Sequence, residues 1–185
     1  MIKPLVNYGQ KYGIDDFLRL VRTSEDQFGD SAIPPDSAIR KELVPARILF
    51  TKLSGIKFVV WNESGSPDFT VWIGIEKHGY EMVATIDWPE RQIPKRIGET
   101  ECVELVQHEI ELVKKRIEGK EHKKYGEPYR LVVSIDSIAP VFRRRAPRFF
   151  FALKHAVMSI DHSFPAILAV SALLDIVERI DVNPH

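Results

Sequence analysis

The middle of the chain changes from a helical to a strand-like pattern, and this change limits the folds open to the sequence. Residues 56–61, 69–76 and 80–87 are rich in β-branched and aromatic residues and are separated by short turn sequences. This pattern predicts three consecutive antiparallel strands. A fourth strand is predicted at residues 130–134. Because helical periodicity surrounds these strands, we expect an α+β fold with helices packed on the sheet.

Five stretches have the spacing of apolar residues that is typical of helices. The second of them contains Pro45, which we expect to kink the helix or to split it. The last one is almost wholly apolar and follows Ser163, a favourable N-cap, so we expect a buried C-terminal helix. The five predicted helices cover residues 15–23, about 36–53, 99–118, 148–160 and 164–180.

The length of 185 residues allows one ordinary domain. Apolar residues make up 44% of the chain and charged residues 28%, which is enough apolar material for a buried core. We expect a single α+β domain over residues 1–185, built around an antiparallel three-strand meander plus a fourth strand. Its parts are an N-terminal helix and loop (1–35), a sheet core (36–136), and a basic turn with a C-terminal helical pair (137–185).

Charge and cysteine content exclude several classes of protein. The chain has 26 Lys and Arg and 26 Asp and Glu, so bulk charge does not drive it onto nucleic acid or anionic membranes. Its one cysteine, Cys102, rules out an internal disulfide and a cysteine-based zinc site. We find no targeting segment, and the longest apolar run is too short to span a bilayer. We therefore expect a cytoplasmic protein with no membrane partner.

Two aspartates near the predicted hairpin are candidates for a metal site. If residues 78–79 form a two-residue turn, one face of the hairpin is wholly apolar and forms core. In this register Asp68 lies opposite Pro89, and Asp87 is its diagonal neighbour, with roughly 7 Å between backbones. Two carboxylates at this spacing can share Mg²⁺ or Mn²⁺, and Glu42 on the preceding helix is a candidate third ligand.

The predicted order of helix, three strands, helix and strand over residues 36–136 resembles the core of the PD-(D/E)xK nuclease superfamily. Pro67-Asp68 stands where that family has its first acid, and Asp87 stands near its second. The resemblance implies metal-dependent cleavage of phosphodiesters, in which a bound cation activates water and a lysine assists. The lysine expected two residues after the second acid is replaced by Pro89, and Lys95 is our candidate substitute.

The segment from residue 91 to residue 148 is basic, with 14 Lys and Arg against nine Asp and Glu. Phenylalanines are interleaved with the second of its two tight clusters, and cations with exposed aromatic side chains suit nucleic acid or an acidic protein surface. The alternative interpretation is a solvated helix end and a solvated turn. The candidate partner-binding residues are Lys114, Lys115, Arg116, Arg143, Arg144, Arg145 and Arg148.

Two functional hypotheses follow from these features. The sequence contains no complete catalytic set, which favours a binding or accessory protein that contacts its partner through the basic C-terminal half and needs no cofactor. The alternative is a divalent-metal-dependent nuclease, or an inactive relative of one. In that case Asp68, Asp87 and Glu42 hold Mg²⁺ or Mn²⁺. A structural role is also open for both aspartates, with Asp68 closing a turn and Asp87 ending a strand.

Overall fold

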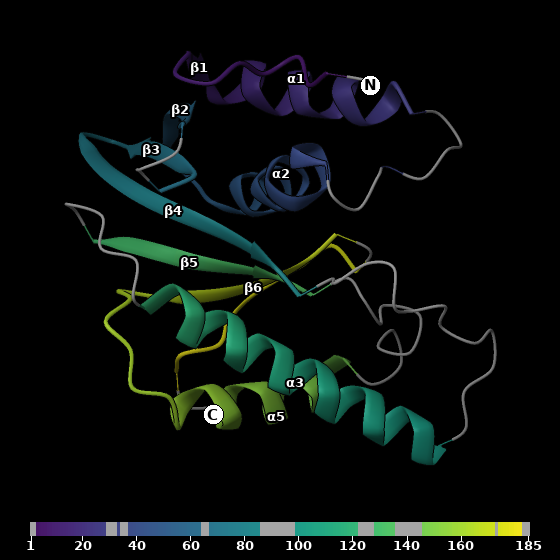
Figure 1. Cartoon of the computed structure of the whole chain (residues 1–185). Coiled ribbons are helices and arrows are strands. Elements are labelled where there is room, and N and C mark those ends of the chain that lie inside the picture. The colour runs from purple at the N-terminus through teal and green to yellow at the C-terminus, as the bar shows by residue number, and fades with distance from the viewer. Residues whose placement is uncertain are drawn as a thin grey trace.

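The structure is a computed structural model that describes residues 3–28, 33, 37–63, 67–85, 99–121, 128–135, 146–172 and 174–182. It has the α+β composition that the sequence predicts, with one seven-stranded mixed sheet and helices on both of its faces (Figure 1). The strands are β1 (Lys11–Gly13), β2 (Ile56–Trp61), β3 (Phe69–Ile73), β4 (Glu76–Ala84), β5 (Tyr129–Ser134), β6 (Ile167–Ser171) and β7 (Ile176–Arg179). The helical segments are α1 (Ile14–Asp26), the π-helical η1 (Ile39–Leu43), α2 (Val44–Lys52), α3 (Glu99–Glu121) and α5 (Ala146–Met158).

The strands lie side by side in chain order from β1 to β7. Strands β1 to β4 are antiparallel, β4, β5 and β6 are parallel, and β7 returns antiparallel to β6. Strand β4 joins the two halves. It pairs with β3 from Glu76 to Tyr80 and with β5 from Gly79 to Ala84. Beyond Tyr80, β4 extends past the end of β3, and we call this place the fork of the sheet.

Two apolar clusters cover the two faces of the sheet. On the face that we call the α2 face, α1, η1 and α2 pack against alternate residues of β2, β3 and β4, among them Trp61, Phe69 and Tyr80. On the opposite face, the α3 face, α3 and α5 pack against β5 and β6 through Leu131 and Ile167. Figure 1 shows the resulting three layers, with α1 and α2 above the sheet and α3 and α5 below it.

Most of the predicted local elements are present. Strand β2 has the predicted bounds, while α1, α3, α5 and β5 differ from the predicted segments by a few residues at their ends. The helix around Pro45 is irregular: the π-helical η1 passes into α2 without a gap, and the proline occupies the first turn of α2. Proline lacks the N–H of the regular helix ladder, and a π-helical turn is a common irregularity where that ladder is interrupted.

The predicted register of the second hairpin is wrong. The turn lies at residues 74–75, where Gly74 has φ +63° and Ile73 pairs with Glu76. Residues 78 and 79, which were expected to form the turn, lie inside β4. Gly79 is needed there for a different reason, because an added Cβ would come within 3.0 Å of Pro67 and 3.1 Å of Tyr129. Glycine inside a strand commonly marks such a close approach.

The C-terminal helix predicted at residues 164–180 is also wrong, because this segment forms β6 and β7. Ile167 and Ala169 of β6 are buried on the α3 face, and Val170 is buried on the α2 face. A parallel strand that is buried on both faces reads as a continuous apolar run, which periodicity alone does not separate from a buried helix. The short strand β1 was not predicted. The predicted order of three strands plus one therefore becomes seven strands.

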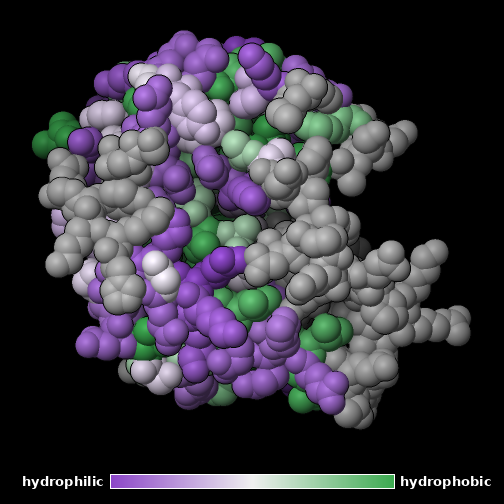
Figure 2. Space-filling view, in the orientation of Figure 1, coloured by the Kyte–Doolittle hydropathy of each residue, from purple (hydrophilic) through white to green (hydrophobic). Residues whose placement is uncertain are grey.

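The surface of the described residues is mostly hydrophilic. Figure 2 shows purple over much of the described part of this face, with small separate areas of green. Large exposed hydrophobic side chains are scattered over different elements, from Ile75 in the β3–β4 turn to Phe151 on α5. Within the described chain, no helix is both long and apolar enough to cross a bilayer.

The close contact at Gly79 gives a test of the register. Substitution of Gly79 by alanine places a methyl group against Pro67 and Tyr129, and we expect it to lower the free energy of unfolding by about 1–3 kcal/mol. Gly13→Ala is the matched control, because a Cβ there meets nothing within 4 Å and φ is −62°. Urea denaturation measures both variants. Equal stability of the two variants would contradict this register.

Candidate functional site

Two carboxylates meet at the fork between β3 and β4. Phe69 pairs with Tyr80, so the next position outward places Asp68 opposite Glu81. Asp68 Oδ2 accepts a hydrogen bond of 2.7 Å from the backbone N–H of Met82, which fixes this carboxylate against β4. The sheet supplies that free N–H because β3 no longer pairs with β4 beyond Tyr80. The fork thus positions Asp68 beside Glu81.

A lysine from α3 completes this pair. Glu81 is only 1% exposed, and its carboxylate forms an ion pair and hydrogen bond with Lys120 Nζ. The hydroxyl of Tyr129 donates to the Lys120 carbonyl oxygen at 3.1 Å and so ties the last turn of α3 to the start of β5. A charge as buried as that of Glu81 needs such a partner. Lys120 therefore holds the carboxylate in place at the sheet.

Glu42 approaches the same region from η1. Its Oε2 accepts a hydrogen bond of 2.7 Å from Trp61 Nε1, and the ring of Tyr8 lies 3.8 Å from that of Trp61. Burial raises the pKa of Glu42, the charge of Glu81 raises it further, and the Trp61 hydrogen bond and Lys120 oppose these effects. Because the charge of Glu81 acts on Glu42, the two carboxylates from β4 and η1 belong to one electrostatic cluster.

The pKa of Asp68 is raised from 3.8 to about 7. Burial is the largest cause, and the charges of Glu81 and Glu42 add to it. The hydrogen bond from Met82 and the charge of Lys120 lower the pKa but do not cancel these effects. Asp68 therefore changes charge near neutral pH. A strongly shifted carboxyl beside two other acids is common at functional sites.

Carboxylate oxygens are the ligands that Mg²⁺ and Mn²⁺ prefer, so the donor chemistry of Glu42, Asp68 and Glu81 fits such a cation. Among the described residues, however, no three His, Cys, Asp or Glu side chains are grouped as a ready metal site. Glu42 and Glu81 are each engaged by another side chain, Trp61 and Lys120. Binding a cation would require the carboxylates to turn from these partners towards one another.

The sequence-based metal site overlaps only in part with this cluster. The structure brings Asp68 and Glu42 into it, but the register that made Asp87 the diagonal neighbour of Asp68 is wrong. Asp87 and the candidate lysine Lys95 both lie outside the described residues. Sequence reasoning missed Glu81 and Lys120. The available signal for Glu81 was its position as the charged residue in the otherwise apolar run 80–84.

The predicted basic surface is described in part. Lys114 lies 3.7 Å from Glu111 and is partly buried, Lys115 is exposed, and Arg116 is partly buried on the same helix, α3. Arg148 is exposed near the start of α5, which packs against α3. The cluster Arg143, Arg144 and Arg145 lies outside the described residues. Partner binding through this surface stays a prediction.

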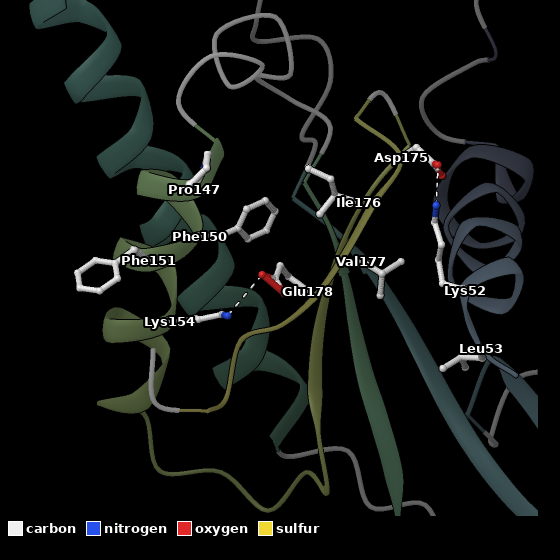
Figure 3. Close-up of a pocket in the computed structure, with 10 residues that line it drawn as sticks. All are labelled: Lys52, Leu53, Pro147, Phe150, Phe151, Lys154, Asp175, Ile176, Val177 and Glu178. Atoms are coloured by element: carbon white, nitrogen blue, oxygen red, sulfur yellow. Dashed lines mark hydrogen bonds and ion pairs between the residues drawn. The ribbon is translucent and has the colours of Figure 1, made fainter. Parts of the chain in front are cut away.

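A groove of about 770 Å³ lies at the other end of the sheet, between α5, β7 and the end of α2 (Figure 3). Its two lysines are paired with acids, Lys52 with Asp175 at 2.6 Å and Lys154 with Glu178 at 3.5 Å. The rest of its lining is largely apolar and includes Phe150. These paired charges offer little acid–base chemistry, so the carboxylate cluster at the fork is the stronger candidate site.

The raised pKa of Asp68 predicts how stability depends on pH. The folded state keeps the Asp68 proton up to about pH 7, whereas the unfolded chain loses it near 3.8, so stability from this group falls as pH rises between those values. Asp68→Asn retains the acceptor for Met82 and removes the charge. We expect it to raise the free energy of unfolding by about 1–4 kcal/mol at about pH 8 and to change it little near pH 4.

Urea denaturation at the two pH values tests this expectation. Asp161→Asn is the control, because Asp161 is an exposed aspartate away from the cluster. A stability difference for Asp68→Asn that is the same at both pH values would show that the charge is not the cause.

Removal of the Lys120 ammonium should destabilise the fold, because it leaves the buried Glu81 carboxylate without its partner. Lys120→Met removes the ammonium from a carboxylate that is almost fully buried, and we expect a loss of about 3 kcal/mol in unfolding free energy. Adding Glu81→Gln to this variant should recover much of the loss. Thermal denaturation measures the series, with Lys115→Met on an exposed position of α3 as the control. Equal losses in Lys120→Met and the control would contradict this pairing.

The chain matches no protein family model, no curated protein sequence and no solved structure. The functional assignment therefore depends on the geometry of Glu42, Asp68, Glu81 and Lys120 at the fork of the sheet.

Proposed function

We propose that the chain is a divalent-cation-dependent phosphodiesterase that acts on nucleic acid, with its active site at the β3–β4 fork. The observation that supports the proposal is the position of Asp68 just before β3, bonded to the Met82 N–H of β4 and within the field of Glu81, with Lys120 paired to Glu81. The order α2, β2, β3, β4, α3, β5 supports it, because this is the order that resembles the PD-(D/E)xK core.

In this proposal Asp68 and Glu81 hold Mg²⁺ or Mn²⁺, and Glu42 contributes from η1. The bound cation supplies a water of lowered pKa and stabilises the charge that develops on the phosphate. Deprotonated Asp68 is needed as a ligand, and its pKa of about 7 in the metal-free protein means that cation and proton compete for the same oxygens. Cation binding should therefore strengthen as pH rises through neutrality.

Lys120 could take the role of the lysine that the family motif places on the strand of the second acid. If Glu81 is the second acid of the motif, the position two residues later is Val83, which carries no charge. Lys120 reaches the same carboxylate from the end of α3. Its ammonium is thus in position to orient a water or to stabilise a phosphate oxygen near Glu81. This assignment replaces Lys95, whose surroundings are outside the described residues.

An inactive relative and an accessory protein remain distinct alternatives. A cluster that binds a cation without cleaving nucleic acid would indicate an inactive relative. Partner binding through the basic C-terminal half depends strongly on Arg143, Arg144 and Arg145, which the structure does not describe. The carboxylate cluster therefore has the stronger physical support, since its residues have defined contacts.

Calorimetric titration with Mn²⁺ tests the metal site. We expect saturable binding to the wild type and to the Asp161→Asn control, tighter at about pH 8 than at about pH 6 because Asp68 must lose its proton. Binding should be lost in Asp68→Asn. The titration is repeated with a phosphorothioate oligonucleotide of about 12 nucleotides, so that a site completed by substrate is also detected. Absence of binding in both titrations would overturn the proposal.

Cleavage is then assayed with labelled DNA and RNA in Mg²⁺ or Mn²⁺. Wild type and Asp161→Asn should cleave, whereas Asp68→Asn should lose at least about 100-fold in rate, since catalysis is assigned to the bound cation. Metal binding without cleavage of any substrate would identify an inactive relative instead.

A further inference from the structure

The α3 face of the sheet is partly open beside the candidate active site. Helices α3 and α5 pack against β5 and β6 on this face (Figure 1). Phe58 on β2, in contrast, is 40% exposed. The register places Phe58 opposite Trp72 of β3, and Trp72 opposite Lys77 of β4. Lys11 on β1 extends over both aromatic rings, with Nζ 4.1 Å from the Phe58 centroid and 4.6 Å from the Trp72 centroid. We call Lys11, Phe58, Trp72 and Lys77 the aromatic patch.

The aromatic patch shares one face of the sheet with Glu81, whose carboxylate is paired with Lys120 of α3. Strand side chains alternate, so Lys77 and Glu81 of β4 point to the same side, which is also the side of Trp72, the register partner of Lys77. Lys77 is four residues from Glu81 along β4, a separation of roughly 13 Å at about 3.3 Å per residue, and the charge of Glu81 acts on Asp68 just before β3. A chain bound across the aromatic patch would therefore extend towards Asp68 and Glu81. Within the described strands β1 to β4, the exposed charges that face this side near the aromatic rings are lysines.

We propose that the aromatic patch binds single-stranded nucleic acid, with bases stacked on Phe58 and Trp72 and phosphates near Lys11 and Lys77. Aromatic side chains on an open sheet face, together with cations, are a general means of holding unpaired bases and their backbone. This inference rests on the proposed function, because it names the substrate that the site at the fork would receive. Paired bases are stacked within a duplex and leave no base face for the two rings.

Lys11 does not block this use of the rings. It is an exposed lysine on a three-residue strand, so its side chain can swing away at small cost. Stacking of a base on an aromatic ring contributes more than a cation–π contact at an exposed site. The displaced ammonium would then be free to contact a phosphate of the same strand. Exchange of a cation–π contact for a base and a phosphate contact is thus favourable.

Fluorescence anisotropy in EDTA tests binding without cleavage. The probes are labelled oligothymidylate and oligouridylate of about 12 nucleotides and a mixed-sequence duplex of similar length, all with the full chain. We expect both single strands, or one of them, to bind more tightly than the duplex. Trp72→Ala and Phe58→Ala should each weaken this binding at least about 5-fold. Phe151→Ala, an aromatic residue on α5 that is 54% exposed, is the matched control and should bind as the wild type does.

Further variants separate this inference from the proposed function. Lys11→Ala should lower the slope of log affinity against log salt by about 0.7, as expected for one lost phosphate contact to a single strand. Asp68→Asn should bind the single strand like wild type while losing cleavage. Single-strand binding that depends on Trp72, without any cleavage, would support the aromatic patch and count against the active site.

Three outcomes would overturn the aromatic patch proposal: tighter binding of duplex than of either single strand, unchanged affinity in both Trp72→Ala and Phe58→Ala, or no binding by the wild type. Circular dichroism and thermal denaturation of each variant accompany the assay. If Phe58→Ala unfolds, Phe58→Leu keeps the apolar side chain without the ring and replaces it in the comparison.

Discussion

The pairing of β4 is the constraint on which the rest of the structure depends. This strand is antiparallel to β3 over its first half and parallel to β5 over its second, so it joins an antiparallel and a parallel half of one sheet. The change of partner leaves the backbone N–H of Met82 available, and Asp68 accepts its hydrogen bond. Buried backbone donors need such partners. The change of partner at β4 therefore supplies the backbone donor that holds the Asp68 carboxylate in place.

The carboxylate cluster works against the stability of the fold. Asp68 lies beside Glu81 and within the field of Glu42, and burial with these charges raises its pKa to about 7. Ionisation of Asp68 at neutral pH therefore costs folding free energy that an apolar residue would not cost. Lys120 relieves part of this cost through Glu81. Such local destabilisation is common where a protein keeps charged groups ready for a ligand.

On the α3 face, helices cover the parallel half of the sheet more fully than the antiparallel half, and the less covered half is the surface that we propose binds nucleic acid. Helices α3 and α5 bury the parallel half through residues such as Val113 and Leu153. On the antiparallel half the same face carries Phe58 and Trp72 under the side chain of Lys11. The fork lies at the border between the covered and the open regions. Binding on the open strands and chemistry at the border would thus be adjacent.

The sequence by itself determined the α+β class and most of the local elements before residue 160. Amphipathic spacing identified α3, β-branched runs identified β2 and β5, and Pro45 marked the irregularity at the start of α2, because these signals act between residues close in the chain. Asp68 and Glu42 were also recognisable as candidate ligands from their residue type and place in the order of elements.

The tertiary structure decided the register, the C-terminal strands and the composition of the candidate site. Gly79 reads as a turn residue, but packing against Pro67 and Tyr129 puts it inside β4, and the resulting shift brings Glu81 to Asp68. The apolar run that forms β6 becomes a strand because β5 offers it a parallel edge to pair with. Lys120 meets Glu81 from 39 residues away. Such contacts depend on the packing of distant segments, which short-range sequence patterns do not encode.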